Sequence, residues 1–167
     1  MKTENKKQIN KNCSAFTLIE LLVTISIIGI LSTLLLSNFN AARERARDAQ
    51  RKSDLKNIQI ALRLYYNDYG GYPTASGTTI AGCGALGKTS CVWGETWSAG
   101  TGGTVYMSTL PKDPLDDGEK YMYRYVYTDG DNYTLSACLE NRSDEKGIPI
   151  IPAESWCPTN KKIVVKP

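Results

Sequence analysis

Residues 16–39 read FTLIELLVTISIIGILSTLLLSNF, an apolar stretch whose only charged residue is Glu20. As a helix it would be ~36 Å long at ~1.5 Å per residue, enough to cross a hydrocarbon core of ~30 Å. A cleaved secretory signal has a shorter apolar core followed by a small-x-small cleavage site, which the residues from Asn38 to Ala42 do not offer. We therefore expect residues 16–39 to form a transmembrane helix, with a simple signal anchor as the other interpretation of the same length.

Glu20 distinguishes this stretch from an ordinary anchor. A carboxylate inside a membrane helix costs ~2.5 to 3.5 kcal/mol, so such residues are rare and usually have a partner. The polar leader ends at Ala15, directly before Phe16. Cleavage at that bond would create an α-amino group at the start of the helix. The ammonium of a neighbouring copy, displaced along the helix axis, could then neutralise Glu20 and set the register between copies.

The net charge of the chain is located in the leader. Residues 1–15 hold four lysines and one glutamate, which gives the whole formal charge of +3. The chain has no histidine, and so lacks the usual general base and the commonest metal ligand. Residues 73–167 show no nucleophile beside a base, no metal-ligand spacing and no phosphate-binding loop. We therefore expect no enzymatic activity and no cofactor.

The helical pattern continues beyond the apolar stretch. No proline occurs between its start and Pro73, and no glycine occurs between Gly29 and Gly70. Apolar residues at alternating spacings of three and four form a stripe suited to packing on a core, namely Leu55, Ile58, Leu62, Tyr65, Tyr69 and Tyr72. We predict that the helix continues to about Tyr69, with residues 40–72 as its amphipathic part.

Residues 43–56 carry an excess of positive charge. Opposite charges alternate there at helical spacing, which is typical of a solvated helix face. The charged residues are Arg43, Glu44, Arg45, Arg47, Asp48, Arg51, Lys52, Asp54 and Lys56. Contact with anionic lipid headgroups, or with nucleic-acid phosphates along an assembled fibre, remains the alternative interpretation.

Residues 73–167 are expected to form a globular head. Residues 74–104 are rich in glycine, serine and threonine, which predicts loops and turns with little regular structure. Residues 121–139 predict a β-hairpin, with Tyr121 to Tyr127 as the first strand and a turn at 128–132. The hairpin is expected to cover the apolar stripe of the helix. The predicted fold class is therefore α+β, a long N-terminal helix packed on a small antiparallel sheet.

The chain contains five cysteines, of which Cys13 would leave with the leader. If the four remaining cysteines lie outside the cytoplasmic membrane, they indicate two disulfides from three possible pairings. We favour Cys83 with Cys91, closing the glycine-rich loop, and Cys138 with Cys157, tying the C-terminal tail to the second strand. A zinc site formed by all four cysteines is the alternative, although the chain has no C-x2-C pair.

The N-terminal segment carries a specific resemblance. The leader ending in Ala15, the run from Phe16 through Glu20 and the apolar stretch to Phe39 resemble the cleavage and methylation segment of type IV prepilins and pseudopilins. The resemblance implies that a prepilin peptidase removes residues 1–15, cutting between Ala15 and Phe16, and methylates the Phe16 amine. It assigns to Glu20 the pairing with that amine during filament assembly. The departure is Ala15, where the family usually has glycine.

This resemblance implies a pilin-like fold and a structural function. The chain would be a pilin of a type IV pilus or related filament, polymerised through its N-terminal helix. The alternative is a pseudopilin of a type II secretion or competence system, and a signal-anchored binding protein or enzyme is the third class. The implied partners are other copies, prepilin peptidase, the assembly ATPase with its platform, and membrane lipid before assembly. The chain would start as a single-pass cytoplasmic membrane protein with its head outside, and end in an extracellular pilus or a periplasmic pseudopilus.

Some secretion pseudopilins bind calcium in C-terminal loops, so we consider the clustered aspartates of the head. One cluster is Asp113, Asp116 and Asp117, and the other is Asp129 and Asp131. An EF-hand is excluded by its spacing, and aspartates in turns commonly accept hydrogen bonds from their own backbone. Calcium binding stays open. The cysteine pairs and the lack of an aspartate-rich C-terminal loop favour a pilus subunit over a pseudopilin.

Overall fold

The computed structural model describes residues 16–100 and 102–167, apart from the side chains of 34–38. The predicted leader, with Ala15, lies outside the described residues. The chain forms two compact units, Met1–Asn40 and Ala41–Pro167. Helix α1, Leu18–Tyr69, contributes to both units and contains 52 residues.

Helix α1 ends where the sequence predicts a break. The next residue, Gly70, has a φ of 70°, a left-handed conformation that glycine adopts without steric cost. Tyr72 of the predicted 40–72 segment therefore lies beyond the helix. In the part of the chain that the structure describes, no helix combines the length and the apolar character needed to cross a membrane.

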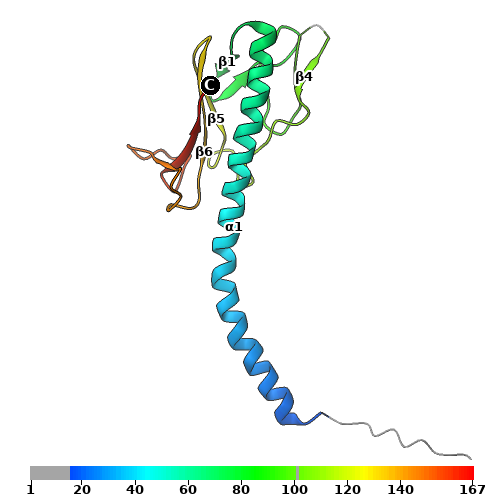
Figure 1. The fold of residues 1–167 in the computed structure, drawn as a ribbon, viewed down its shortest axis with the longest axis vertical. Helices are drawn as coiled ribbons and strands as arrows, with labels where there is room; N and C mark the ends of the chain where they lie inside the picture. The colour runs from blue at the N-terminus through cyan, green and yellow to red at the C-terminus, as the bar shows by residue number, and fades with distance from the viewer. Residues whose placement is uncertain (1–15, 101) are drawn as a thin grey trace, which may run out of the picture. The chain divides into compact units, whose positions relative to one another are not determined.

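The second unit contains a four-stranded antiparallel sheet beside α1 (Figure 1). Strands β5 (Arg124–Asp129) and β6 (Asn132–Cys138) form a hairpin, with Tyr125 opposite Leu135. The C-terminal tail forms β8 (Lys161–Val165), which pairs with β6, and β7 (Ile148–Pro149) pairs with the outer side of β8. The tail is therefore a sheet strand and not only a segment held by a disulfide.

The predicted hairpin is present, but its first strand begins later than the sequence indicates. We expected the strand to start at Tyr121, whereas β5 starts at Arg124. Tyr121 has a φ of 55°, a left-handed conformation that cannot continue an extended strand. The alternation of tyrosines therefore extends beyond the strand, and Tyr121 packs in a separate cluster with Ile150 and Trp156.

The glycine-rich segment is mostly loop and turn, but it also contains short strands that the sequence did not predict. It begins with a short hairpin of β1 (Thr74–Ser76) and β2 (Thr79–Ala81). A second antiparallel pair follows, β3 (Trp97–Ala99) and β4 (Thr104–Met107). Glycines permit these tight connections, as at Gly77 with a φ of 62°. Such short strands carry too few residues to show a periodic pattern.

The core of the second unit lies between α1 and the strands. Leu55, Ile58, Leu62 and Tyr65 of α1 are buried against residues of every sheet, including Ile80, Trp97, Tyr106, Tyr125, Tyr133 and Leu135. The apolar stripe predicted from the sequence is thus the face that packs on the head. The α+β fold class, a long helix with small antiparallel sheets, is confirmed.

Candidate functional site

The first unit presents an apolar helix whose described side chains face outward. Each described side chain from Phe16 to Thr33 is exposed, and Phe16 itself is 79% exposed. The large apolar residues point around the whole helix circumference and include Leu18, Ile19, Leu21, Leu22, Val23, Ile25, Ile27, Ile28, Ile30 and Leu31. A helix that is apolar on all sides needs an apolar environment supplied from outside its own unit.

Glu20 closes a capping box at the start of α1. The Thr17 hydroxyl accepts a hydrogen bond from the Glu20 N–H at 3.3 Å. In return, the Glu20 carboxylate accepts bonds from the Thr17 N–H at 3.3 Å and the Thr17 hydroxyl at 3.0 Å. This exchange satisfies two backbone donors that a helix start otherwise leaves open.

Sequence reasoning missed this cap, although Thr-x-x-Glu directly before an apolar run is its known signal. The cap means that Glu20 has a local partner before any second copy arrives. A neighbour's ammonium would have to replace or share the contacts from Thr17. The predicted cleavage bond between Ala15 and Phe16 includes a residue outside the described part of the chain.

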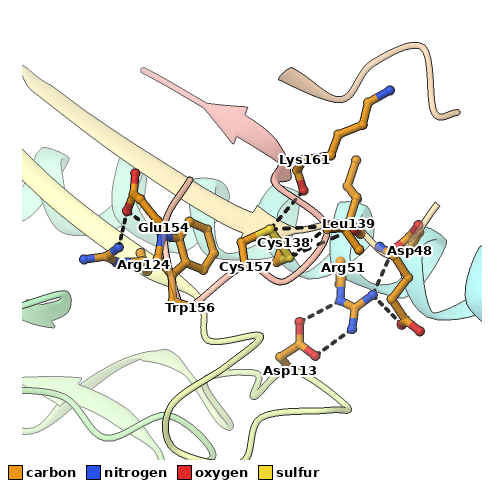
Figure 2. Close-up of a disulfide and its surroundings, with 12 residues drawn as sticks. Asp48, Arg51, Asp113, Arg124, Cys138, Leu139, Glu154, Trp156, Cys157 and Lys161 are labelled. Atoms are coloured by element: carbon orange, nitrogen blue, oxygen red, sulfur yellow. Dashed lines mark hydrogen bonds and ion pairs between the residues drawn. A yellow bond between two sulfur atoms is a disulfide. The ribbon is translucent and has the colours of Figure 1, made fainter. Parts of the chain in front are cut away.

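The second unit contains a buried ion network centred on Arg51. The Arg51 guanidinium makes a two-bond contact with Asp113, at 2.6 Å and 2.9 Å. It also donates to Asp48 at 2.7 Å and to Glu140 at 2.7 Å. Arg47 adds a second guanidinium on Glu140, at 2.7 Å from its Nε. The network therefore links α1 to the loop after β4 and to the loop after β6 (Figure 2).

Asp48, a carboxylate that α1 contributes to the network, has hydrogen-bond partners besides Arg51. Asp48 also accepts bonds from the backbone N–H groups of Glu140 at 2.9 Å and Asn141 at 2.8 Å. Burial alone would lower the pKa of Arg51, but its hydrogen bonds to Asp113, Glu140 and Asp48 outweigh burial and raise it. Arg51 thus stays charged, and a buried charge of this kind requires all its partners.

The pKa values of Glu140 and Asp144 are lowered by their cationic partners. Burial tends to raise the pKa of Glu140, but hydrogen bonds from Arg47 and Arg51 outweigh it and lower the pKa below its usual value. The ammonium of Lys52 contacts Asp144 and lowers its pKa. Both carboxylates are therefore held ionised by the helix.

The predicted solvated face of residues 43–56 is wrong for its central residues. Asp48, Arg51 and Asp54 are buried, and Asp54 accepts a bond from the buried Tyr123 hydroxyl at 2.7 Å. A signal for this existed in the sequence. Asp48 and Arg51 continue the three-and-four spacing of the stripe that starts at Leu55, so they lie on the core face.

The structure contains disulfides between Cys83 and Cys91 and between Cys138 and Cys157. These are the two pairings favoured from the sequence. The first closes the loop between β2 and β3. The second holds the loop before β8 against the end of β6, in a small buried cluster with Ile150 and Trp156 (Figure 2).

The five candidate calcium aspartates serve other contacts. Both carboxylate oxygens of Asp113 accept hydrogen bonds from Arg51, and Asp131 accepts a hydrogen bond from the Tyr66 hydroxyl at 2.7 Å. Asp116, Asp117 and Asp129 accept bonds from nearby backbone N–H groups in their own turns. Within residues 16–100 and 102–167, no group of three or more acidic or cysteine residues is arranged to hold a metal ion.

Comparisons with known proteins match both units. Residues 10–36 match the family described as "Prokaryotic N-terminal methylation motif", and residues 38–147 match "Type II secretion system (T2SS), protein G". No solved structure gives a significant match.

Three curated relatives illustrate the similarity. A type II secretion system core protein G from Aeromonas hydrophila is 37% identical over 60% of this chain and 66% of its own length. A core protein G from Pseudomonas aeruginosa is 34% identical over 74% of this chain and 83% of its own length. A type IV wide pilus major component from Thermus thermophilus is 33% identical over 60% of this chain and 84% of its own length.

Proposed function

We propose a function from the premise that this chain belongs to the type II secretion system protein G family. The chain acts as a pseudopilin, a structural subunit that is cut between Ala15 and Phe16 and polymerises through its N-terminal helix. The observation that carries the proposal is the methylation motif at 10–36 joined directly to the protein G match at 38–147. The sequence alone favoured a pilus subunit, and the relatives named core protein G favour the secretion pseudopilin instead.

The geometry of the first unit supports polymerisation. A helix with apolar side chains on all sides needs apolar surroundings, which lipid supplies before assembly and neighbouring apolar helices supply in the filament. Cleavage would place a new ammonium at Phe16, at the end of the helix that holds Glu20. In the filament, the Phe16 ammonium of one copy binds the Glu20 carboxylate of the next copy. This ion pair replaces the hydrogen bonds that Thr17 donates to Glu20 within one copy. This exchange selects one axial offset between copies.

The proposal assigns no chemical step and no cofactor to the chain. Prepilin peptidase performs the cleavage and the methylation of Phe16, and an assembly ATPase with its platform drives polymerisation. Before assembly the apolar segment is held in lipid of the cytoplasmic membrane with the head outside, and afterwards it forms the core of a periplasmic pseudopilus. Calcium and nucleic acid are not part of the proposed function.

The capping box allows a sharp test of the role of Glu20. Glu20→Gln keeps an oxygen for the Thr17 N–H but removes the charge, whereas Glu20→Ala removes both. We expect both variants to be processed at Phe16 and both to lose filaments, because the ammonium needs a charged partner. Thr17→Ala, which weakens only the cap, should assemble. The measurement is the amount of sheared filament, with mass spectrometry of the mature N-terminus.

Two outcomes would contradict the proposal. An intact Met1 terminus on a stable membrane protein would indicate a simple anchor. Normal filaments from Glu20→Gln, with none from Glu20→Ala, would assign Glu20 to the cap and remove the ion pair.

A type IV pilus subunit is the second candidate, and the Thermus relative is the observation in its favour. Deleting the chain separates the two candidates. Loss of exported proteins from the medium with surface pili retained supports the pseudopilin, and loss of pili with export retained supports the pilus subunit.

A further inference from the structure

The loop between β6 and β7, residues 139–147, is held by positive groups from other elements. We call it the β6–β7 loop. The Lys161 ammonium, from β8, donates to the Arg142 carbonyl at 2.6 Å. The Lys52 ammonium, from α1, contacts the Asp144 carboxylate. Two ammonium groups of the chain therefore bind oxygens of one loop, a backbone carbonyl and a carboxylate.

Lys161 reaches the β6–β7 loop across Gly147. A Cβ atom at residue 147 would lie 2.3 Å from Cε of Lys161 and 2.7 Å from its Cγ. Any larger residue at this position would therefore displace the lysine chain. The backbone of Lys161 is also fixed, because it pairs with Pro149 of β7 and its carbonyl accepts the Leu139 N–H at 2.8 Å. The fold thus keeps this ammonium at the loop.

The guanidinium groups of α1 hold the start of the β6–β7 loop. Arg47 and Arg51 both donate to the Glu140 carboxylate at 2.7 Å. Asp48 accepts the backbone N–H groups of Glu140 and Asn141. Together with the two lysines, four cationic side chains from outside the loop therefore contact it.

The oxygens of the β6–β7 loop that could bind a metal ion already accept hydrogen bonds. Calcium takes about six to eight oxygen ligands, mostly carboxylates, carbonyls and water. One oxygen of Asp144 contacts Lys52, and the other accepts a backbone N–H at 3.0 Å. The side-chain oxygen of Asn141 accepts a backbone N–H at 3.0 Å, and its carbonyl accepts another at 3.2 Å. Within the described residues, Glu145 is the one acidic residue of the loop without such a partner.

The charges around the loop also oppose a divalent cation. The pKa of Asp144 is lowered, chiefly by its hydrogen bond from Lys52, and the nearby charge of Lys161 adds to this effect. Asp144 is thus ionised and already neutralised. A calcium ion would have to displace ammonium groups that the fold holds in position, and such preorganised groups lose little entropy when they bind.

We infer that this chain holds its β6–β7 loop with its own cations, where some secretion pseudopilins use calcium in a C-terminal loop, so that the head folds without calcium. Lys161 binds the loop backbone and Lys52 binds Asp144. The Cys138–Cys157 disulfide closes the segment beside the loop (Figure 2). The donor set of the loop does not fit calcium. The inference goes beyond the proposed function, because it concerns the ion requirement of the head and not its polymerisation.

Melting the full-length chain in detergent tests the inference directly. The melting temperature should be the same in millimolar calcium and in excess chelator. A calcium ion bound by the folded head at ~100 times its Kd would instead raise the melting temperature by roughly 5 to 10 °C. Hydrogen exchange at the amides of residues 140–147 should also be the same in both solutions.

A lysine substitution provides the second measurement. Lys161→Met keeps an aliphatic chain across Gly147 but removes the ammonium, so exchange at residues 140–147 should accelerate by about tenfold. Lys162→Met is the matched control. It removes one positive charge from the next residue of β8, whose side chain makes no hydrogen bond or ion pair in the described part of the chain. Loop exchange should not change in this control, and unchanged exchange in β6 checks that both variants fold.

The outcomes separate this inference from the proposed function. A rise in the wild-type melting temperature with calcium would overturn the inference, and so would equal loop exchange in Lys161→Met and Lys162→Met. If such a chain still forms filaments with a methylated Phe16, the proposed function stands. A calcium-independent head on a chain that is neither processed nor polymerised would overturn the proposed function alone.

Discussion

The two halves of α1 share one backbone geometry but distribute their side chains differently. In the first half, apolar residues surround the helix and every described side chain is exposed. In the second half, one face is buried at Leu55, Ile58 and Leu62, whereas the opposite face is exposed and carries polar residues together with Ile60 and Leu64. The difference shows that the period of the apolar pattern determines which part of a helix surface can pack on the same chain. A stripe is satisfied by the head of the same chain, and a uniform apolar surface requires other molecules.

The two halves also use acidic residues differently. Glu20 is exposed and is held by a neutral threonine, so it can exchange partners. Asp48 is buried and bound by Arg51 and by backbone donors of the head, so its contacts are fixed. One carboxylate is free to change partners, and the other attaches the helix to the head permanently.

The largest expected effect comes from breaking that permanent attachment. Arg51→Ala leaves Asp48 and Asp113 buried without their cation and should lower the free energy of unfolding by ~3 to 5 kcal/mol. Arg47→Ala is the control, because its side chain is 30% exposed and contacts Glu140 alone among the carboxylates of the network, so its loss should be below ~1 kcal/mol. Urea unfolding of the full chain in detergent, followed by tryptophan fluorescence, measures both. Equal losses would contradict a central role for Arg51.

Removing the disulfides should have the next largest effect. Replacing Cys138 and Cys157 by alanine opens a loop with a sequence separation of 19 and should cost ~3 kcal/mol in the loop-entropy model. Replacing Cys83 and Cys91 opens a separation of 8 and should cost ~2.5 kcal/mol. The same urea titration applies. The first half of α1 has no such link in its described part, so its hydrogen exchange should not change in either variant.

Acid should weaken the attachment of helix to head gradually. The pKa values of Glu140 and Asp144 are lower in the folded chain than in the unfolded chain. Their stabilising contribution is therefore fully present above the unfolded pKa values of ~4, and it is lost as the pH falls through the folded values. The melting temperature should fall as the pH drops below the unfolded pKa values of ~4. Glu140→Gln should flatten part of this decrease, and an unchanged pH profile would argue against the ion pairs.

The smallest expected effect concerns the first half of α1. Thr17→Ala removes the cap and should destabilise the first helical turn by ~0.5 to 2 kcal/mol. Hydrogen exchange should accelerate at the amides of residues 18–21 only. Unfolding measured by tryptophan fluorescence should stay the same, since all three tryptophans, Trp93, Trp97 and Trp156, lie in the second unit. A shift in that transition would mean that the two halves are coupled.

Local sequence patterns were sufficient to predict several elements of the fold. The helix end at Gly70, the buried stripe from Leu55 to Tyr65 and the hairpin around 128–132 follow from glycine conformation, helical spacing and turn composition. These depend on residues close together in the chain. The cap of Glu20 by Thr17 was equally local and was readable from its spacing.

Other features depended on residues far apart in the chain. Charge alternation at 43–56 predicted a solvated face, and only the folded chain brings Asp113 and Glu140 against Arg51. The short strands of the glycine-rich segment form only because each pairs with another within a packed head.

The sequence by itself determined the family, the fold class and the position of the apolar N-terminal segment, because each of these is encoded by residues at fixed spacings along the chain. The tertiary structure alone decided which distant residues pair with the buried charges and where β5 begins. The physical reason is that burial and long-range pairing are properties of the packed chain. No local pattern specifies which distant residue will supply a charge's partner.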